Sequence, residues 1–292
     1  MVIKILSSKD YSPQGPNYGD CILIDTGNTL VVYDCGCEEH AKQVEAYMEE
    51  NSYSQTVVIL SHNDADHFDG IPYLVEKKLV SKVYTHLFLQ HKEKILELLD
   101  DGRVTNKSVG DRIKKVYANI ASLSRKVKLM DALKGHTVVP GITIVGPSEE
   151  YALETITKAL DSSTGDSIDA ESVINAASIQ VSVDVGATKA LLCGDASFEA
   201  IKDKLGDYSV IQLPHHGKPA TAEKIFAEKL GKNQSVYLVS DNTGNSNGGS
   251  KDLNTAGKDV RRTWTGDIIY PASVSASNTA CAVSRRTLGL EF

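Results

Sequence analysis

Short apolar runs separated by polar turns dominate the start of the chain. Residues 20–25 (DCILID) and 29–34 (TLVVYD) are β-rich runs, and the Thr-Gly-Asn turn at 26–28 favours a hairpin between them. Residues 38–50 place apolar side chains on one face at helical spacing, so we expect a helix there. The continuous apolar run TVVIL at 56–60 is typical of a strand buried in a covered sheet.

The segment 92–125 has a helical pattern of apolar positions. It predicts two amphipathic helices around a break at 100–107. The second helix carries an apolar stripe made of Ile113, Val116, Tyr117, Ile120 and Leu123. We interpret this segment as a helical pair packed on the core, and the alternative is a mobile lid over a site.

Strand-like runs return after residue 141. The pattern predicts a helix near 149–160, and a second helix at 220–230 that ends at Gly231, a usual residue after a helix. The predicted strands are 142–146, 179–185, 189–194, 209–214, 235–240, 260–264, 267–270 and 279–284. Residues 241–259 are rich in Gly, Asn and Ser and predict a long loop. Its GNSNGGSK stretch lacks the spacing of a phosphate-binding loop.

The composition is that of an ordinary globular protein. The chain has 292 residues with 41% hydrophobic and 24% charged side chains, which excludes a disordered, collagen-like or coiled-coil protein. The net charge of -7 argues against tight binding of long nucleic acid through phosphate contacts. A nucleic-acid substrate would therefore have to be held locally.

Neither the apolar runs nor the cysteines indicate a membrane or a secreted protein. No run of about 18 apolar residues is present, and the N-terminal stretch lacks the pattern of a signal peptide. Five cysteines, an odd number in a long chain, favour a reduced cytoplasmic protein with buried thiols. A thiol enzyme using Cys35 and Cys37 is a weaker hypothesis, because C-x-C lacks the redox spacing C-x-x-C.

Ionisable side chains gather in the polar loop SHNDADHFDG at 61–70. His62, Asp64, Asp66 and His67 lie directly after a predicted buried strand. Carboxylates this close raise one another's pKa and resist ionising together. A divalent cation removes that conflict, so we expect a metal site at this loop.

Two further strand ends carry the same kinds of ligand. Asp195 follows LLCG, and His215 and His216 follow IQLP. Taken alone, Asp195 fits a helix cap and the histidine pair fits a solvated loop. Together with the 61–70 loop, three strand ends bearing His and Asp could converge on a pair of metal ions.

The loop at 61–70 resembles the H-x-H-x-D-H signature of the metallo-β-lactamase-fold hydrolases. Asp in the second ligand place resembles the competence-protein (ComEC-like) branch, which includes phosphorylcholine-esterase-like enzymes. Other segments match that branch in order: GDCILI at 19–24, VYDCG with Asp34, NAAS at 175–178, LLCGDAS with Asp195, LPHHG with His215, VS at 239–240 and RTWTGDI at 262–268. The resemblance covers most of the chain and is weakest around 90–130.

The resemblance implies an α/β fold, a four-layer αββα sandwich with metals at one sheet edge. The chain would form one domain, 1–292, with a helical insertion at about 90–130. His62 and Asp64 would hold one metal, and Asp66, His67 and His215 the other, with Asp195 bridging. The spacing leaves open whether His215 or His216 is the ligand. The remaining implied site residues are His216 as a supporting residue or proton donor, and Asp34, Asn175 and Ser178 as supports.

Three departures from the wider family bear on the site. The histidine that the family has shortly before the bridging Asp is replaced by the stretch Asn175 to Ser178. Lys218 stands where the branch has Ser after HHG, as either an exposed cation or a clamp on an anionic oxygen. The later GHP of the branch is absent from the loop 241–259. Because that histidine is replaced, the first metal site would have fewer protein ligands.

The leading hypothesis is a metal-dependent hydrolase that uses a metal-bridging hydroxide, with Asp66, His216 and Lys218 as candidate catalytic residues. The cofactors would be two divalent ions about 3.5–4 Å apart, zinc first, with manganese or iron as alternatives. We expect a phosphoester or phosphodiester, either an anionic small molecule or a single-stranded nucleic acid. The alternatives are a carboxylic ester, lactone or thioester hydrolase, or a non-enzymatic metal-stabilised sensor or binding module.

Overall fold

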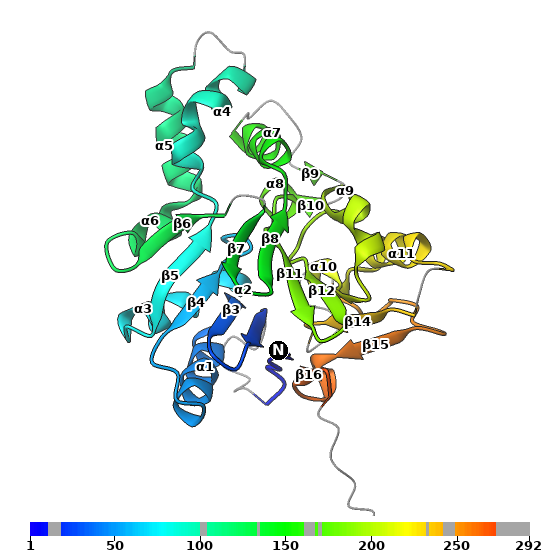
Figure 1. Ribbon diagram of the computed structural model, residues 1–292. Helices are drawn as coiled ribbons and strands as arrows, with labels where there is room; N and C mark the ends of the chain where they lie inside the picture. The colour runs from blue at the N-terminus through cyan, green and yellow to red at the C-terminus, as the bar shows by residue number, and fades with distance from the viewer. Residues whose placement is uncertain are drawn as a thin grey trace, which may run out of the picture.

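The computed structural model describes residues 1–10, 19–99, 104–132, 135–160, 167–168, 171–231, 234–241 and 249–272. Two large β-sheets dominate it (Figure 1). The strands of the first sheet are β1 (Val2–Ile5), β2 (Cys21–Asp25), β3 (Leu30–Cys35), β4 (Thr56–Ile59), β5 (Val80–Thr85), β6 (Lys128–Asp131) and β16 (Ile268–Tyr270). Their spatial order is β16-β1-β2-β3-β4-β5-β6, and β3 to β6 run parallel.

The second sheet is formed mainly by the second half of the chain. Its strands are β7 (His136–Val139), β8 (Ile142–Gly146), β11 (Gln180–Val185), β12 (Thr188–Leu192), β13 (Val210–Gln212), β14 (Val236–Val239) and β15 (Asp259–Arg262). Their order is β15-β14-β13-β12-β11-β8-β7, with β12 to β15 parallel. A separate two-stranded ribbon pairs β9 (Ser167–Ile168) with β10 (Glu171–Ser172).

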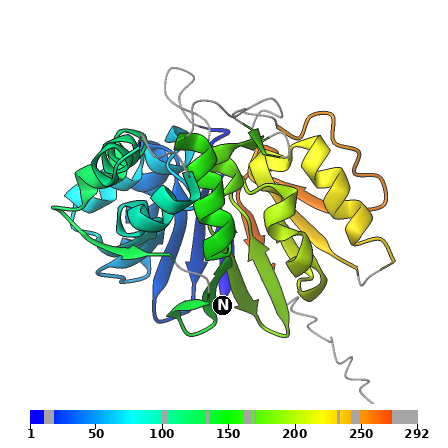
Figure 2. The same ribbon diagram turned by 90° about the horizontal axis from the view of Figure 1, so that it is seen from above.

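Helices surround the two sheets, and the longer ones lie mainly on their outer sides (Figure 1 and Figure 2). They are α1 (Glu38–Glu50), α2 (Ala65–Phe68), α3 (Ile71–Glu76), α4 (Lys92–Leu99), α5 (Asn106–Val116), α6 (Ala118–Leu123), α7 (Glu149–Leu160), α8 (Val173–Ala176), α9 (Phe198–Ile201), α10 (Pro214–Gly217) and α11 (Pro219–Glu228). Seen from above, the two sheets stand face to face between these helices (Figure 2).

Strand β3 shows how the sequence produces this layering. Because side chains alternate across a strand, Val31 and Tyr33 enter the core between the two sheets. Leu30 and Val32 point the other way and pack with residues of α1 and α3. Both faces are buried, which explains the continuous apolar run. The second sheet packs in the same manner against α9 and α11, so the predicted four-layer αββα sandwich is confirmed.

The carboxyl ends of the central strands of both sheets meet at one edge. The Tyr33 hydroxyl donates to the Ile179 carbonyl at 2.7 Å, and the Ile179 amide donates to the Ser61 carbonyl at 3.0 Å. These two hydrogen bonds join the sheets beside the loop that follows β4. The short helices α2, α8 and α10 lie at this same edge (Figure 1).

The predicted helical insertion lies between β5 and β6, but its described residues form three helices after the 3₁₀ turn Phe88–His91. The expected second helix breaks at Tyr117, whose φ of -108° and ψ of 34° are not helical. The Asn63 side-chain amide donates to the Val116 carbonyl at 2.9 Å, and the Asn119 side chain accepts from the Ile120 amide at 2.9 Å. The break divides the predicted apolar stripe between two clusters, because α5 packs against α4 and α7 while α6 packs against the first sheet.

Most predicted elements occur close to their expected places, with some differences. Helix α11 ends at Glu228, before the predicted end at Gly231. Part of the expected loop 61–70 is the short helix α2, and β1, β5, β6 and β7 were not predicted. The predicted strand 279–284 and residues 242–248 of the predicted loop lie outside the described residues. Among the described helices, none has both the length and the hydropathy to cross a bilayer. The prediction of one domain over the whole chain stays a prediction, as does the lid hypothesis.

Candidate metal centre

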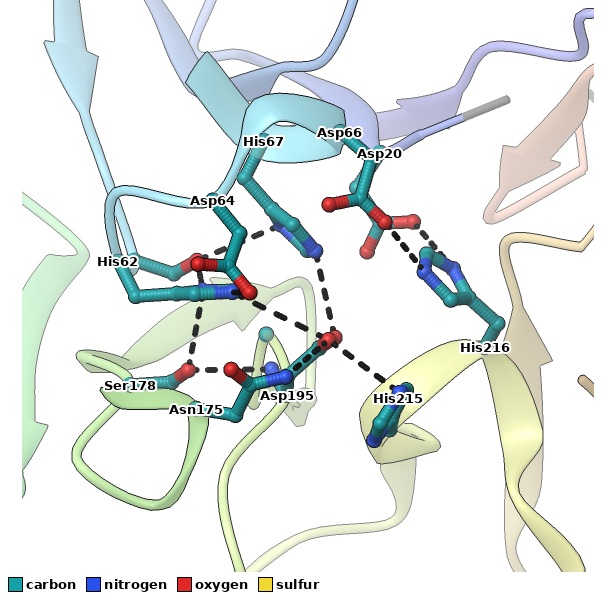
Figure 3. Close-up of polar contacts among 12 residues, drawn as sticks. Asp20, His62, Asp64, Asp66, His67, Asn175, Ser178, Asp195, His215 and His216 are labelled. Atoms are coloured by element: carbon teal, nitrogen blue, oxygen red, sulfur yellow. Dashed lines mark hydrogen bonds and ion pairs between the residues drawn. The ribbon is translucent and has the colours of Figure 1, made fainter. Parts of the chain in front are cut away.

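The loop after β4 and the short helix α2 present four of the predicted ligands. His62 lies shortly after the strand, Asp64 precedes the first turn of α2, and Asp66 and His67 lie within that turn. The side chains of His62, Asp66 and His67 are buried, whereas that of Asp64 is 44% exposed. Three of these four side chains therefore lie inside the protein at the sheet edge, and Asp64 lies on the side of the cluster that is open to solvent (Figure 3).

Asp34, at the end of β3, fixes the orientation of His67. One carboxylate oxygen accepts from the Ser61 amide at 2.6 Å, and the other accepts from the Ser61 hydroxyl at 2.6 Å and from His67 Nδ1 at 2.8 Å. Asp34 has a φ of 59°, a left-handed conformation that Asp and Asn tolerate better than most residues. With Nδ1 bound to Asp34, His67 turns its Nε2 towards Asp195.

Asp195 reaches the same place from the end of β12. Its Oδ1 is 3.3 Å from His67 Nε2, and its Oδ2 is 3.9 Å from His62 Nε2. His62 Nε2 is also 3.7 Å from Asp64 Oδ2. Gly194 allows this approach, because it has a φ of 52° and a Cβ there would lie 2.7 Å from the Ser61 Cβ.

The two predicted supports come from α8, which carries Asn175, and from the segment just after it, which carries Ser178. The Asn175 amide donates to Asp195 Oδ2 at 3.1 Å. The Ser178 hydroxyl accepts from the Asp195 backbone amide at 3.2 Å and lies 3.2 Å from His62 Nδ1. Asn175 and Ser178 therefore support Asp195 and His62 through hydrogen bonds, at the place where the resembled family has a histidine.

The two adjacent histidines at α10 point in different directions. His216 Nε2 is 3.2 Å from Asp66 Oδ2, and its Nδ1 contacts the Ser240 carbonyl at 2.9 Å and Asp20 Oδ1 at 3.2 Å. Asp66, His67 and His216 thus have ligand atoms that lie within 4.8 Å of one another. His216, rather than His215, shares this place with Asp66.

His215 faces Asp195 from the other side. Its Nε2 is 3.9 Å from Asp195 Oδ2, while its Nδ1 contacts the carboxylate of Glu171. Left-handed φ values of 52° and 54° at His215 and His216 separate the two rings. The predicted assignment of His215 as a metal ligand stays a prediction.

Glu171 is a buried carboxylate that sequence analysis missed. Besides His215, it contacts Lys218 Nζ at 3.1 Å and accepts from the Thr221 hydroxyl at 3.3 Å. The Lys218 side chain is 21% exposed, so it is not the exposed loop cation of one interpretation. Asp20 was missed as well, although it precedes β2 in the GDCILI segment. Neither carboxylate has a sequence signal beyond its residue type, because its partners are distant in the chain.

The geometry and the hydrogen bonding of this cluster fit a divalent metal. Within the described part of the chain, His62 Nε2, His67 Nε2 and Asp195 Oδ1 are buried and make no hydrogen bond of good geometry. Ligand atoms about 2.0–2.1 Å from a tetrahedral ion are about 3.3–3.4 Å apart. The separations of 3.2 Å between His216 and Asp66 and of 3.3 Å between His67 and Asp195 fall close to that length.

The buried charges compensate one another. Burial raises the pKa of Asp195, but His67, His216 and His62 together hold it well below its usual range. Burial lowers the pKa of His67, yet Asp195 and Asp34 outweigh it and the pKa rises well above the ordinary value. The same holds for His216, through Asp20 and Asp66. A metal ion bound here would have to displace any proton on the coordinating imidazole nitrogens.

The fold and the cluster define an α/β protein with a candidate metal centre at a sheet edge, and one family comparison agrees. Residues 14–145 match the family model of the metallo-β-lactamase superfamily. This match covers less than half of the chain and agrees with the resemblance carried by the ligand loop. No curated protein matches the sequence.

Several solved structures are similar to the chain. Igni18, a metallo hydrolase from the archaeon Ignicoccus hospitalis, is 12% identical over 92% of this chain and 99% of its own, with a TM-score of 0.49. A diphosphatase from the PhnP family is 12% identical over 92% and 98%, with a TM-score of 0.46. Zinc-bound PqqB from Methylobacterium extorquens is 12% identical over 77% of each chain, with a TM-score of 0.42. Likeness at this level carries no inference about activity.

Replacing Asp34 by Asn tests whether this residue orients His67. Asn tolerates the left-handed backbone and keeps the shape of the side chain, but it replaces one acceptor oxygen by an NH₂ donor. We expect metal affinity to fall about 10–100-fold, as for other changes to residues that hold a metal-binding histidine. Competition with a chelator measures the affinity, and circular dichroism checks the fold. An unchanged affinity in a folded D34N protein would contradict the role of Asp34.

Proposed function

We propose that the chain is a metallo-hydrolase that binds two divalent ions and cleaves phosphoesters. The observation that carries this proposal is the convergence of buried His and Asp side chains from three strand ends at one edge of the sandwich. Two-metal sites of this kind are common in phosphatases and nucleases. The resemblance of the ligand loop to the ComEC-like branch supports the same substrate class.

The distances favour one division of the ligands. His62 and Asp64 would hold the first ion, and Asp66, His67 and His216 the second. The carboxylate of Asp195 lies between the two groups, with one oxygen towards His67 and the other towards His62. Zinc is the first candidate. The carboxylate of Asp64 is a harder ligand than an imidazole in its place would be. Manganese and iron therefore remain alternatives for the first site.

Ions held there would act as Lewis acids and lower the pKa of water to about 7. The chain's own residues would position the other participants. Asn175 holds the Asp195 carboxylate, and Asp34 holds the ring of His67. Glu171 holds Nδ1 of His215, so that Nε2 faces the centre and is placed to hold or deliver a proton. We assign the proton-carrying role to His215 rather than to His216.

The choice of a phosphoester rests on the carboxylate-rich ligand set, which suits hard cations and anionic oxygens. The net charge of -7 favours a small or single-stranded anion over a duplex. One observation favours the alternative, a carboxylic ester, lactone or thioester. Lys218 is paired with Glu171 and is therefore less suited to clamping a phosphate oxygen.

Side-by-side assays decide between these substrates. Purified protein loaded with zinc, manganese or iron is given bis(4-nitrophenyl) phosphate, 4-nitrophenyl acetate and a chromogenic lactam. We expect about two metal equivalents per chain and hydrolysis of the phosphodiester, abolished by a chelator and restored by metal. Faster turnover of the acetate or the lactam would overturn the choice of substrate. Bound metal without any hydrolysis would favour the non-enzymatic module.

Paired substitutions of the two adjacent histidines test their assignment. His216→Ala removes a ligand, so we expect metal content to fall towards one equivalent and activity to fall more than about 100-fold, beyond the effect of changing a supporting residue. His215→Ala should keep both equivalents and lose activity about 10²–10⁴-fold, the usual contribution of a positioned proton carrier. Elemental analysis and initial rates on the same preparations give both readouts. Loss of metal in H215A alone would reverse the assignment.

A further inference from the structure

A cavity of about 410 Å³ lies in the helical insertion, outside the metal centre. Apolar and aromatic side chains from the end of β5, from α5 and α6 and from β6 form most of its wall. The residues on which the argument rests are His86, Phe88, Lys114, Tyr117, Ala121 and Lys128. Its volume lies in the range of sites for small organic molecules.

The cavity begins one strand away from the metal loop. Strands β4 and β5 are parallel neighbours, with Ile59 paired to Tyr84, so the residues after them emerge side by side. His86 Nε2 donates at 2.9 Å to the carbonyl of Ala177, which immediately precedes Ser178. Ser178 in turn contacts His62 at 3.2 Å. One wall of the cavity and one metal-ligand candidate are therefore connected through the adjacent residues Ala177 and Ser178.

A second wall is tied to the metal loop from the other side. Tyr117 stands at the break between α5 and α6, beside the residues that hydrogen-bond to Asn63. Burial raises the pKa of Tyr117, and the Asp64 carboxylate raises it further. Phe88 packs between the two walls, with ring centroids 4.9 Å from His86 and 5.4 Å from Tyr117.

The solvent-exposed part of the cavity lining carries two positive charges. Lys114, Ala121 and Lys128 line it and are exposed. Lys114 is 3.8 Å from Asp111 in a pair exposed on both sides, which restricts it little. In a chain with a net charge of -7, two lysines beside an apolar cavity favour an anionic occupant over a cationic one.

We propose that this cavity is a subsite for the apolar, aromatic-sized group of an organic phosphoester whose phosphate lies at the metal centre. The inference rests on the proposed function and extends it by naming a class of substrate. The ring system of the substrate lies against Phe88 and Tyr117. The lysines at the opening draw the anion in. The helical insertion thereby sets substrate preference while the sandwich supplies the metal ligands.

Two matched tryptophan variants test occupancy without relying on catalysis. Ala121→Trp fills the cavity from its exposed rim, whereas Ala118→Trp places the same side chain on an exposed position of the same helix outside the lining. The fluorescent anion 8-anilinonaphthalene-1-sulfonate is titrated into the metal-loaded full-length chain. We expect A121W to weaken its binding at least about tenfold and A118W to leave it within about twofold. Equal loss in both, or in neither, would overturn the proposal.

Charge reversal tests the lysines by the same titration. Lys128→Glu should weaken binding of the probe about three- to tenfold, a change of the size expected for one partly exposed charge pair. Lys115→Glu, at an exposed neighbour outside the lining, should not change it. Equal effects of the two variants would indicate general electrostatics and contradict a defined subsite.

A pair of diesters with the same leaving group separates this inference from the proposed function. 4-Nitrophenyl 1-naphthyl phosphate and 4-nitrophenyl methyl phosphate both release 4-nitrophenol. We expect kcat/KM about tenfold higher for the naphthyl ester, an advantage lost in A121W and kept in A118W. Equal hydrolysis of both esters by the unchanged protein would overturn the subsite alone. Hydrolysis of neither, with probe binding still blocked only by A121W, would overturn the proposed function alone.

Discussion

The buried carboxylate of Asp195 is the constraint on which the rest of the site depends. A charge removed from water is costly unless opposite charges and hydrogen bonds surround it. Here His67 lies 3.3 Å away, and His62 and His215 lie 3.9 Å away on the other oxygen. These partners come from both sheets, so the sandwich must bring its strand ends together before the charge can be compensated.

The supporting residues follow from the same constraint. Asp34 contacts Nδ1 of His67, and Glu171 contacts Nδ1 of His215. In each ring Nε2 therefore faces the candidate metal centre. Each imidazole is thereby held between two carboxylates. A cation bound at the free nitrogens would have to displace any proton that they carry. The same pairing of histidines with carboxylates therefore both holds the strand ends together and forms the candidate metal centre.

Much of the fold could be predicted because its signals are local. The helix at Glu38–Glu50 follows from the spacing of its apolar side chains, and the buried strand before the ligand loop follows from its continuous apolar run. The loop with His62 and His67 could be identified as a candidate site because four ionisable side chains lie close together in sequence. The break at Tyr117 could not be predicted in this way, because it depends on Asn63, which is more than 50 residues away.

The remaining parts of the site depend on contacts that sequence spacing does not encode. Glu171 has no local motif, and its partner His215 is 44 residues later. The division of roles between His215 and His216 depends on two left-handed backbone conformations, which no pattern of apolar positions reveals. Lys218 was identified from its place beside the site, but its pairing with Glu171 needed the fold.

The central claim is that Asp195 stands between two cations. Anomalous diffraction from crystals grown with zinc or manganese tests it most directly. The account predicts two anomalous peaks about 3.5–4 Å apart, one beside His62 and Asp64 and the other beside Asp66 and His216, with Asp195 touching both. A single peak, or peaks away from this carboxylate, would contradict it.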